Sequence, residues 1–219
     1  YSLTHSFEGG YRFSTVSGDE SLYRSQANYR NGFSLLNSTL DARFKEGHGR
    51  LFDVLLLTTQ GLGSDPYAIA GLRLEKKDRY RYDMSWRRSD YFNPFLITGG
   101  SRNLANTQRL MQDHDLTVST TRWMNVRLGY SRNSESGPAV SFYELFIGGL
   151  ARSVLPIDKD ARRQWNGYRV GADFDFAGFR LTLSRRWDYY KDDSRTAVLA
   201  PDATYPLADR KSTRLNSSH

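Results

Sequence analysis

The stretch Tyr168–Trp187, YRVGADFDFAGFRLTLSRRW, decides the predicted fold. Apolar and polar residues alternate along it with a period of two, which indicates strands with one apolar face, and Ala177-Gly178 interrupts the pattern in the middle. A two-residue turn there folds the stretch into an antiparallel hairpin. Both faces are then self-consistent. One carries the pairs Phe176–Phe179, Phe174–Leu181 and Tyr168–Trp187, and the other carries Asp175–Arg180 and Asp173–Thr182.

The same alternation recurs along most of the chain and predicts four further hairpins. The Asn31-Gly32 dipeptide is a strong turn signal, and it would set residues 23–29 against residues 34–40. Another hairpin joins residues 68–74 to 80–86. The predicted turns of the four hairpins are Glu8-Gly9-Gly10, Asn31-Gly32, Lys76-Lys77-Asp78 and residues 121–123. Together the hairpins give about ten strands.

Short and long connections alternate between these strands. The long ones fall at residues 17–21, about 45–67, 89–113, 132–166 and after 190. This alternation is typical of up-and-down barrels of the bacterial outer membrane, whose turns lie at one rim and whose loops lie at the other. Residues 51–59 and 140–147 are also strand-like. We place both in long loops, with strand extension beyond the membrane as the alternative. Helical periodicity is weak along the chain, and residues 106–113 are the candidate for a helix.

The fold class predicted from this pattern is all-β, an antiparallel up-and-down transmembrane β-barrel. In such a barrel the apolar face meets lipid and the polar face lines the lumen. The polar faces carry charges of both signs opposite one another, which suits a water-filled or polar-occupied lumen. The lumen-facing candidates are Arg24, Arg73, Glu75, Arg79, Arg81, Asp83, Asp115, Arg127, Arg169, Asp173, Asp175, Arg180 and Arg186.

Aromatic residues, 14% of the chain, support the same fold. Many lie near the ends of predicted strands, where outer-membrane barrels carry girdles of aromatic rings at the membrane interfaces. A general enrichment of aromatic residues in β-rich chains is the alternative explanation. The residues concerned are Tyr80, Tyr91, Phe92, Trp123, Tyr130, Trp187 and Tyr189.

Composition narrows the function classes. The mean hydropathy is −0.64, and no apolar run approaches the ~18 residues that a membrane-spanning helix needs, which excludes a helical membrane protein but not a barrel. The net charge of +7 is spread along the chain among acidic residues, so nucleic-acid binding is not expected. The chain has no cysteine, which excludes disulfides, cysteine-based metal sites and covalent haem attachment within these residues.

Both ends of the chain indicate a fragment. It begins at Tyr1 without a methionine or a leader-like apolar segment, so we expect the true N-terminus to be missing. Residues 209–219, DRKSTRLNSSH, resemble a translated sequencing adapter, and setting them aside leaves residues 1–208 with a net charge of +5. We therefore expect a partial barrel, seen as an open, curled sheet with exposed edges.

Several short segments resemble the large bacterial outer-membrane barrels of the MtrB/PioB type and related barrels of Acidobacteria. The resemblance covers most of residues 1–195 and contains no catalytic signature. It implies a bacterial outer-membrane location, contact with lipid, and a sheath around a periplasmic multihaem cytochrome, with no haem in the barrel itself. The segments are Gly10-Tyr11-Arg12-Phe13, Leu22-Tyr23-Arg24, Arg50-Leu51-Phe52-Asp53, Asp65-Pro66-Tyr67, residues 80–90, Asn106-Thr107-Gln108-Arg109 and Tyr168-Arg169-Val170-Gly171.

Residue patterns that would indicate catalysis or a cofactor are not found, so we expect no enzyme activity and no cofactor in this chain. His5, His48 and His114 are isolated from one another, and Gly61-Leu62-Gly63 reads as a loop without the third glycine of a dinucleotide motif. Acidic residues at 158, 160, 188, 192 and 193 lack the spacing of a calcium loop.

The function predicted is thus a porin-like channel or a sheath for an electron-transfer partner. Two alternatives stay open: a soluble or cell-surface β-sandwich that binds a ligand, and an outer-membrane hydrolase whose site lies in strands outside this chain.

Overall fold

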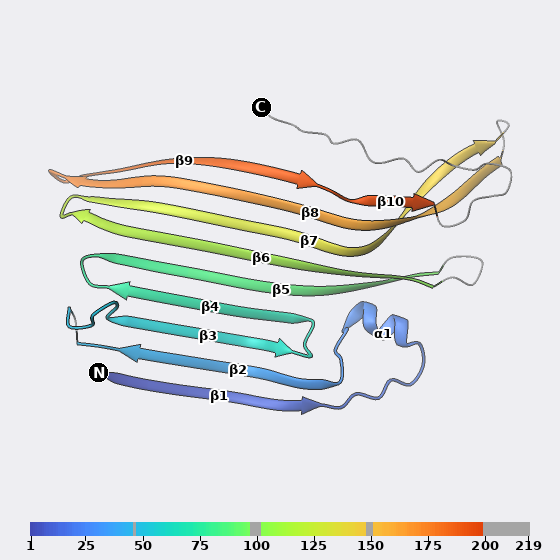
Figure 1. The fold of residues 1–219 in the computed structure, drawn as a ribbon, viewed down its shortest axis with the longest axis horizontal. Coiled ribbons are helices and arrows are strands. Elements are labelled where there is room, and N and C mark those ends of the chain that lie inside the picture. Colours follow the sequence, from blue (N-terminus) through green and yellow to red (C-terminus); the bar gives the residue numbers. More distant parts are fainter. Residues whose placement is uncertain (46, 97–101, 148–150, 199–219) are drawn as a thin grey trace.

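The computed structural model describes residues 1–45, 47–96, 102–147 and 151–198, so the adapter-like segment 209–219 lies outside the described residues. The described chain forms one antiparallel sheet and one short helix (Figure 1). The elements are β1 (Ser2–Arg12), α1 (Glu20–Gln26), β2 (Gly32–Arg43), β3 (Val54–Gly63), β4 (Tyr67–Lys76), β5 (Tyr80–Leu96), β6 (Arg102–Thr121), β7 (Met124–Ile147), β8 (Ala151–Phe176), β9 (Phe179–Asp192) and β10 (Arg195–Val198).

Strands that follow one another in the chain lie next to one another in the sheet, from β1 at one edge to β8. The last two strands, β9 and β10, both pair with β8, against its residues 163–176 and 157–160 respectively. They form successive segments of the second edge, interrupted at residues 193–194. The described sheet is up-and-down and is not closed, as expected for a partial barrel (Figure 1).

The three C-terminal hairpins have the predicted pairing. In the last one Phe176 pairs with Phe179 and Tyr168 pairs with Trp187, while Asp175 pairs with Arg180. The turn between β8 and β9 is Ala177-Gly178, whose φ angles of 52° and 81° are those of the two-residue turn expected there. The β4–β5 hairpin turns at residues 77–79, and the β6–β7 hairpin turns at residues 122–123.

The N-terminal half differs from the prediction. Glu8-Gly9-Gly10 is not a turn, because β1 runs through it and absorbs it as a register shift between Glu8 and Gly9. The predicted hairpin at Asn31-Gly32 was also wrong. Strand β2 pairs with β1 and β3, and the segment expected to pair with it contains α1. Helix formation there is explained by Asp19, whose carboxylate accepts hydrogen bonds from the Ser21 and Leu22 backbone N–H groups as an N-cap.

Segments placed in long loops belong to the sheet. Residues 54–59 lie in β3, between β2 and β4, and residues 140–147 extend β7. The Gly61-Leu62-Gly63 segment, predicted as a loop, forms the end of β3, and residues 106–113, the helical candidate, lie in β6. The predicted strict alternation of short and long connections was wrong, because two short connections follow one another: residues 64–66 between β3 and β4, and residues 77–79 between β4 and β5. Residues 97–101 and 148–150, within predicted long loops, lie outside the described residues.

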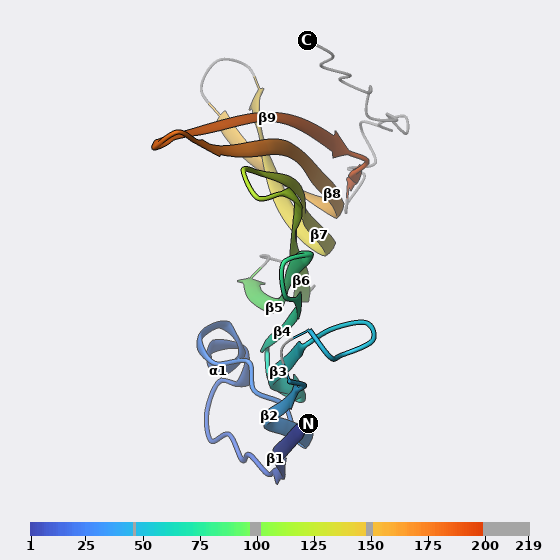
Figure 2. The same cartoon turned by 90° about the vertical axis from the view of Figure 1, so that its left-hand side faces the viewer.

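The sheet is a single layer, which leaves little interior (Figure 2). Among the described residues the buried hydrophobic side chains are Ala68, Phe92 and Ala161. Phe92 is 1% exposed because α1 packs against β5, where the Arg24 guanidinium lies 4.1 Å from the centre of the Phe92 ring. No helix in the described part of the chain has the length and apolar character of a membrane span.

Candidate functional site

Strand pairing sorts the side chains of the sheet onto two faces of opposite character. Residues that pair across antiparallel strands share a face, and neighbours along a strand alternate between faces. One face carries an apolar band that crosses eight neighbouring strands, from β2 to β9. We call this band the apolar belt. It consists of Leu40, Ala42, Leu55, Leu57, Ala70, Leu72, Leu74, Tyr82, Met84, Leu116, Val118, Val126, Leu128, Val170, Ala172, Phe174, Leu181 and Leu183.

The apolar belt is not covered by a second layer of described residues, so large apolar side chains stay accessible. Leu181 and Leu183 are 53% and 54% exposed. Within the belt rows, Arg185 on β9 is the charged exception, and its guanidinium lies 5.1 Å from the Trp187 ring centre. Beyond the belt, the same face carries charged residues such as Arg88 and Arg132. The described residues thus form one large apolar surface without a partner of their own.

A row of rings crosses five strands along one border of the apolar belt, with which it shares Tyr82. It contains Tyr82, His114, Tyr130, Tyr168 and Tyr189, one each from β5 to β9. Successive ring centres are 6.2, 5.7, 5.2 and 5.9 Å apart. The Tyr82 hydroxyl hydrogen-bonds to His114 Nδ1 at 2.8 Å, and the Tyr130 hydroxyl donates to Asn166 at 2.9 Å. The hydroxyl groups of Tyr82 and Tyr130 therefore have partners within the sheet.

The predicted aromatic residues fall into different settings. Tyr130 and Tyr189 belong to this row, and Trp187 pairs with Tyr168. Phe92 lies under α1, while its neighbour Tyr91 projects from the opposite face and is 53% exposed.

The other face of the sheet is charged. Two of the predicted lumen-facing residues are not on it: Arg24 lies in α1, and Arg79 lies in the turn before β5, where its backbone N–H donates to the Lys76 carbonyl. The remaining predicted residues share this face, which we call the charged face. Its charged residues include Asp41, Arg43, Arg73, Glu75, Arg81, Asp83, Arg87, Arg109, Asp113, Asp115, Arg127, Glu135, Arg163, Arg169, Asp173, Asp175, Arg180, Arg186, Asp188 and Asp192.

Charges on this face form pairs, many of them between strands. Asp83 accepts hydrogen bonds from the Nε atoms of Arg73 and Arg81, both at 2.7 Å. Further pairs are Arg87–Asp113 at 3.1 Å, Arg127–Asp173, Arg180–Asp175 and Arg186–Asp188 at 3.0 Å, and Arg169–Asp115. These side chains are largely accessible, so each pair contributes little stability, about 0–1 kcal/mol. Their collective effect is a polar surface whose charges are locally balanced.

Sequence reasoning missed part of the charged face. On β5 the alternate residues are Arg81, Asp83, Ser85 and Arg87, so following the period of two beyond Ser85 would have found Arg87. Asp113 was missed because residues 106–113 were taken as a helical candidate, although they lie in β6 opposite β5.

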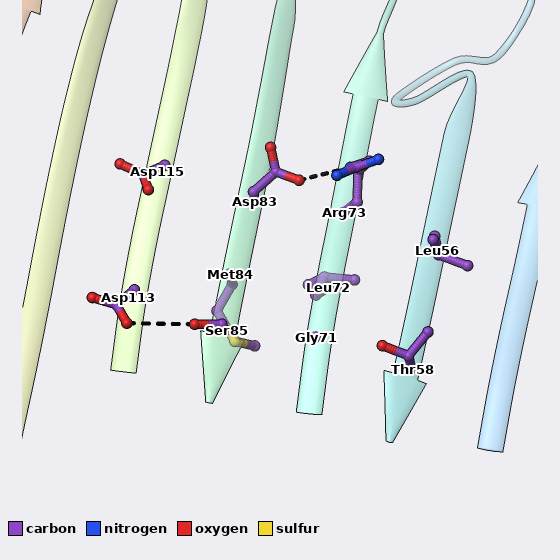
Figure 3. A pocket seen from close by; sticks show the side chains of 10 residues that line it. All are labelled: Leu56, Thr58, Gly71, Leu72, Arg73, Asp83, Met84, Ser85, Asp113 and Asp115. Atoms are coloured by element: carbon purple, nitrogen blue, oxygen red, sulfur yellow. Dashed lines mark hydrogen bonds and ion pairs between the residues drawn. The ribbon is translucent and has the colours of Figure 1, made fainter. Parts of the chain in front are cut away.

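A hollow of about 300 Å³ opens on the charged face where β4 carries a glycine (Figure 3). A side chain at Gly71 would begin 3.0 Å from the Thr58 hydroxyl oxygen, so the glycine leaves space between β3 and β5. Asp83, Asp113 and Asp115 reach its border, and each has an arginine partner. The hollow is therefore a polar surface feature with its charges already paired.

One rim of the sheet is held together by Asp53, which ends the β2–β3 connection. Asp53 is 4% exposed. Its carboxylate accepts hydrogen bonds from the Lys77 backbone N–H at 2.9 Å and from the Lys76 Nζ at 3.1 Å. The hydrogen bond from the Lys77 N–H is the main reason that the pKa of Asp53 lies well below its ordinary value. Asp53 thus fastens the connection to the β4–β5 turn.

The histidines and acidic residues named in the sequence analysis do not assemble into a metal site in the part of the chain that the structure describes. His5 stacks on Phe7, and His48 lies in the β2–β3 connection. Asp188 and Asp192 pair with arginines, and Asp193 pairs with Lys191. No group of three or more metal-ligating side chains occurs among the described residues.

Comparison with known proteins adds no relative: no protein-family model, curated protein or solved structure matches the chain.

Proposed function

We propose that this chain is part of the wall of a bacterial outer-membrane β-barrel, with the apolar belt against lipid and the charged face toward a polar lumen. One observation carries the proposal: over eight neighbouring strands the apolar belt lies on one face of the sheet, and mostly charged and polar side chains lie behind it on the other face. A β-sandwich would cover the apolar face with a second sheet, and the described strands all belong to one sheet. Lipid is the other environment that suits an accessible apolar face of this extent.

The height of the apolar belt supports the proposal. On β8 the belt residues Val170 to Phe174, together with the flanking rings of Tyr168 and Phe176 on the same face, span roughly 27 Å along the strand at ~3.4 Å per residue. A tilt of about 40° reduces this to roughly 21 Å across the bilayer, near the ~25 Å band of outer-membrane barrels. The ring row from Tyr82 to Tyr189 would then mark one membrane interface.

The pairing of charges favours a water-filled channel. Each of the carboxylates of Asp83, Asp113 and Asp173 has an arginine partner on its own face, so the lumen wall needs no bound partner to neutralise it. A sheath around a multihaem cytochrome is the second candidate, on the strength of the resemblance described above. In both cases the chain would carry no catalytic group.

The proposal is tested by measuring which side chains contact lipid. The chain has no cysteine, so single cysteines at residues 181, 182, 183 and 184 can each carry a unique nitroxide label after the protein is folded into vesicles. Labels at positions 181 and 183, in place of Leu181 and Leu183, should be relaxed by oxygen, which concentrates in lipid. Labels at positions 182 and 184, in place of Thr182 and Ser184, should be relaxed by a water-soluble nickel chelate. Equal access of both reagents at all four positions would refute the lipid-facing belt.

Planar-bilayer recording then separates the two candidates within this class. Large, stable currents from the isolated barrel would support the channel. A closed barrel that co-purifies with a haem-staining protein would support the sheath.

A further inference from the structure

We infer that the connection between β1 and β2 forms a binding pocket for a phosphate-bearing saccharide. Residues 13–31 enclose a hollow of about 740 Å³ on the belt face of the sheet, beyond the belt itself, with Asn106 of β6 at its base. This inference does not depend on the proposed function, because it concerns a pocket formed outside the apolar belt and the charged face. A volume of this size is within the ~300–1,000 Å³ of small-molecule sites.

The wall of the pocket is fixed in place by hydrogen bonds. The Asn31 side-chain oxygen accepts from the Ser14 backbone N–H at 2.6 Å and from the Ser14 hydroxyl at 2.8 Å, which closes the connection into a ring. Asn28 is 5% exposed and donates from its amide to the Asp90 carbonyl at 3.0 Å, which ties the ring to β5. The pocket is thus formed before any ligand binds, which lowers the entropic cost of binding.

Guanidinium groups at the pocket indicate a phosphate. Arg24 and Arg30 both line it, and Arg30 is exposed. Arg24 is held in position by the Phe92 ring beneath it and by a hydrogen bond to Asn106 at 3.4 Å. Glu20 also lines the pocket, which leaves a net charge of +1 among these three side chains. Arginine forks match phosphate oxygens in geometry and charge.

The neutral side chains indicate a sugar attached to that phosphate. Tyr23 and Tyr29 provide ring surfaces, and Asn31 and Asn106 provide amide N–H donors, because the oxygen of Asn31 already accepts from Ser14 and that of Asn106 accepts from Arg24. Sugar rings present apolar faces to aromatic rings and hydroxyl groups to amides, and a bare phosphate would use neither. The combination therefore favours a sugar phosphate over an inorganic anion. Its source is either free sugar phosphate or the phosphorylated core of a membrane glycolipid.

Equilibrium dialysis of the full chain in detergent micelles tests the inference, with glucose 6-phosphate as the probe and glucose and inorganic phosphate as comparisons. Glucose 6-phosphate should bind at least tenfold more tightly than either comparison. Arg30→Gln should weaken its binding about tenfold, as expected for one charge-assisted hydrogen bond. Glu20→Gln should strengthen it, because an acidic group is removed from the pocket.

The matched control is Arg180→Gln, which removes one positive charge from the charged face and should leave binding unchanged. Equal binding by Arg30→Gln and Arg180→Gln would overturn the site. Equal affinity for glucose 6-phosphate and inorganic phosphate would overturn the saccharide. Displacement of the probe by purified lipopolysaccharide would support the glycolipid source, and a failure to displace it would overturn that source in favour of free sugar phosphate.

Discussion

Two adjacent residues on β3 provide a direct measure of what each face of the sheet meets. Leu57 lies in the apolar belt between Leu40 and Leu72, and Thr58 lies on the opposite face beside Gly71. Replacing either by arginine adds the same charge at the same depth of the same strand. If the belt faces lipid, Leu57→Arg places a guanidinium near the middle of the bilayer, whereas Thr58→Arg places it in water.

The expected difference follows from the surroundings of the two positions. An arginine on the lipid face near the midplane of an outer-membrane barrel costs about 2–4 kcal/mol, which reduces the ratio of folded to unfolded protein by roughly 30-fold to 900-fold. At Thr58 the new side chain would extend into the hollow left by Gly71, whose border also includes Asp83 (Figure 3). Thr58→Arg should therefore change the free energy of unfolding by no more than about 0.5 kcal/mol.

The assay is guanidinium-induced unfolding of both variants in lipid vesicles, followed by tryptophan fluorescence and started from the folded and the unfolded protein. Leu57→Arg should shift the midpoint strongly to lower denaturant, and Thr58→Arg should keep the midpoint of the unmodified chain. Equal midpoints for the two variants would refute the assignment of the belt to lipid. So would a larger loss at Thr58 than at Leu57, because it would reverse the two faces.

Three further predictions concern parts of the fold outside the belt. Because the pKa of Asp53 is lowered in the folded protein, the stabilisation by its carboxylate is present above about pH 4 and is lost as the pH falls through the pKa of the folded state. Asp53→Asn should remove this acid dependence, measured as proteolysis of residues 44–52 between about pH 2 and 6. Persistence of the dependence in the variant would contradict the role of Asp53. Phe92→Ala should release α1 at a cost of about 3 kcal/mol, seen as faster amide exchange over residues 20–26, whereas Tyr91→Ala, from the opposite face, should leave that exchange unaltered. Ala177→Asn should raise stability by about 1 kcal/mol because Ala177 has a φ of 52°, which asparagine tolerates better; an unchanged urea midpoint would count against this.

The hairpins that sequence alone placed correctly share a simple property: their turns are two or three residues long and both flanking strands alternate cleanly. In the Ala177-Gly178 hairpin the period of two and the turn length together allow only one register. The same local information placed many charged residues of β4 to β9, such as Arg73, Asp83 and Arg180, on one face. For these strands the pattern of residues was sufficient, because both partners of each pair lie close together in the chain.

Sequence reasoning failed where the partner of a segment is distant or where local signals compete. Apolar and polar residues do not alternate in the run Val54-Leu55-Leu56-Leu57, so the period of two did not identify it as a spanning strand. In the sheet, Val54 and Leu56 lie on the charged face, opposite Glu75 and Arg73. Gly9 and Gly10 are typical turn residues, yet pairing with β2 holds them in a strand. Alternation predicted a strand over residues 23–29, but the Asp19 cap and the contact of Arg24 with Phe92 on distant β5 stabilise a helix over Glu20–Gln26.

The sequence by itself determined the all-β class, the C-terminal hairpins and the separation of apolar from charged side chains, because each depends on spacing along a few neighbouring residues. Only the tertiary structure decided which strands neighbour one another in the N-terminal half, where α1 packs, and that residues 13–31 enclose a pocket over Asn106. Those features depend on contacts between residues far apart in the chain, and the free energy of such contacts is not encoded in any local pattern.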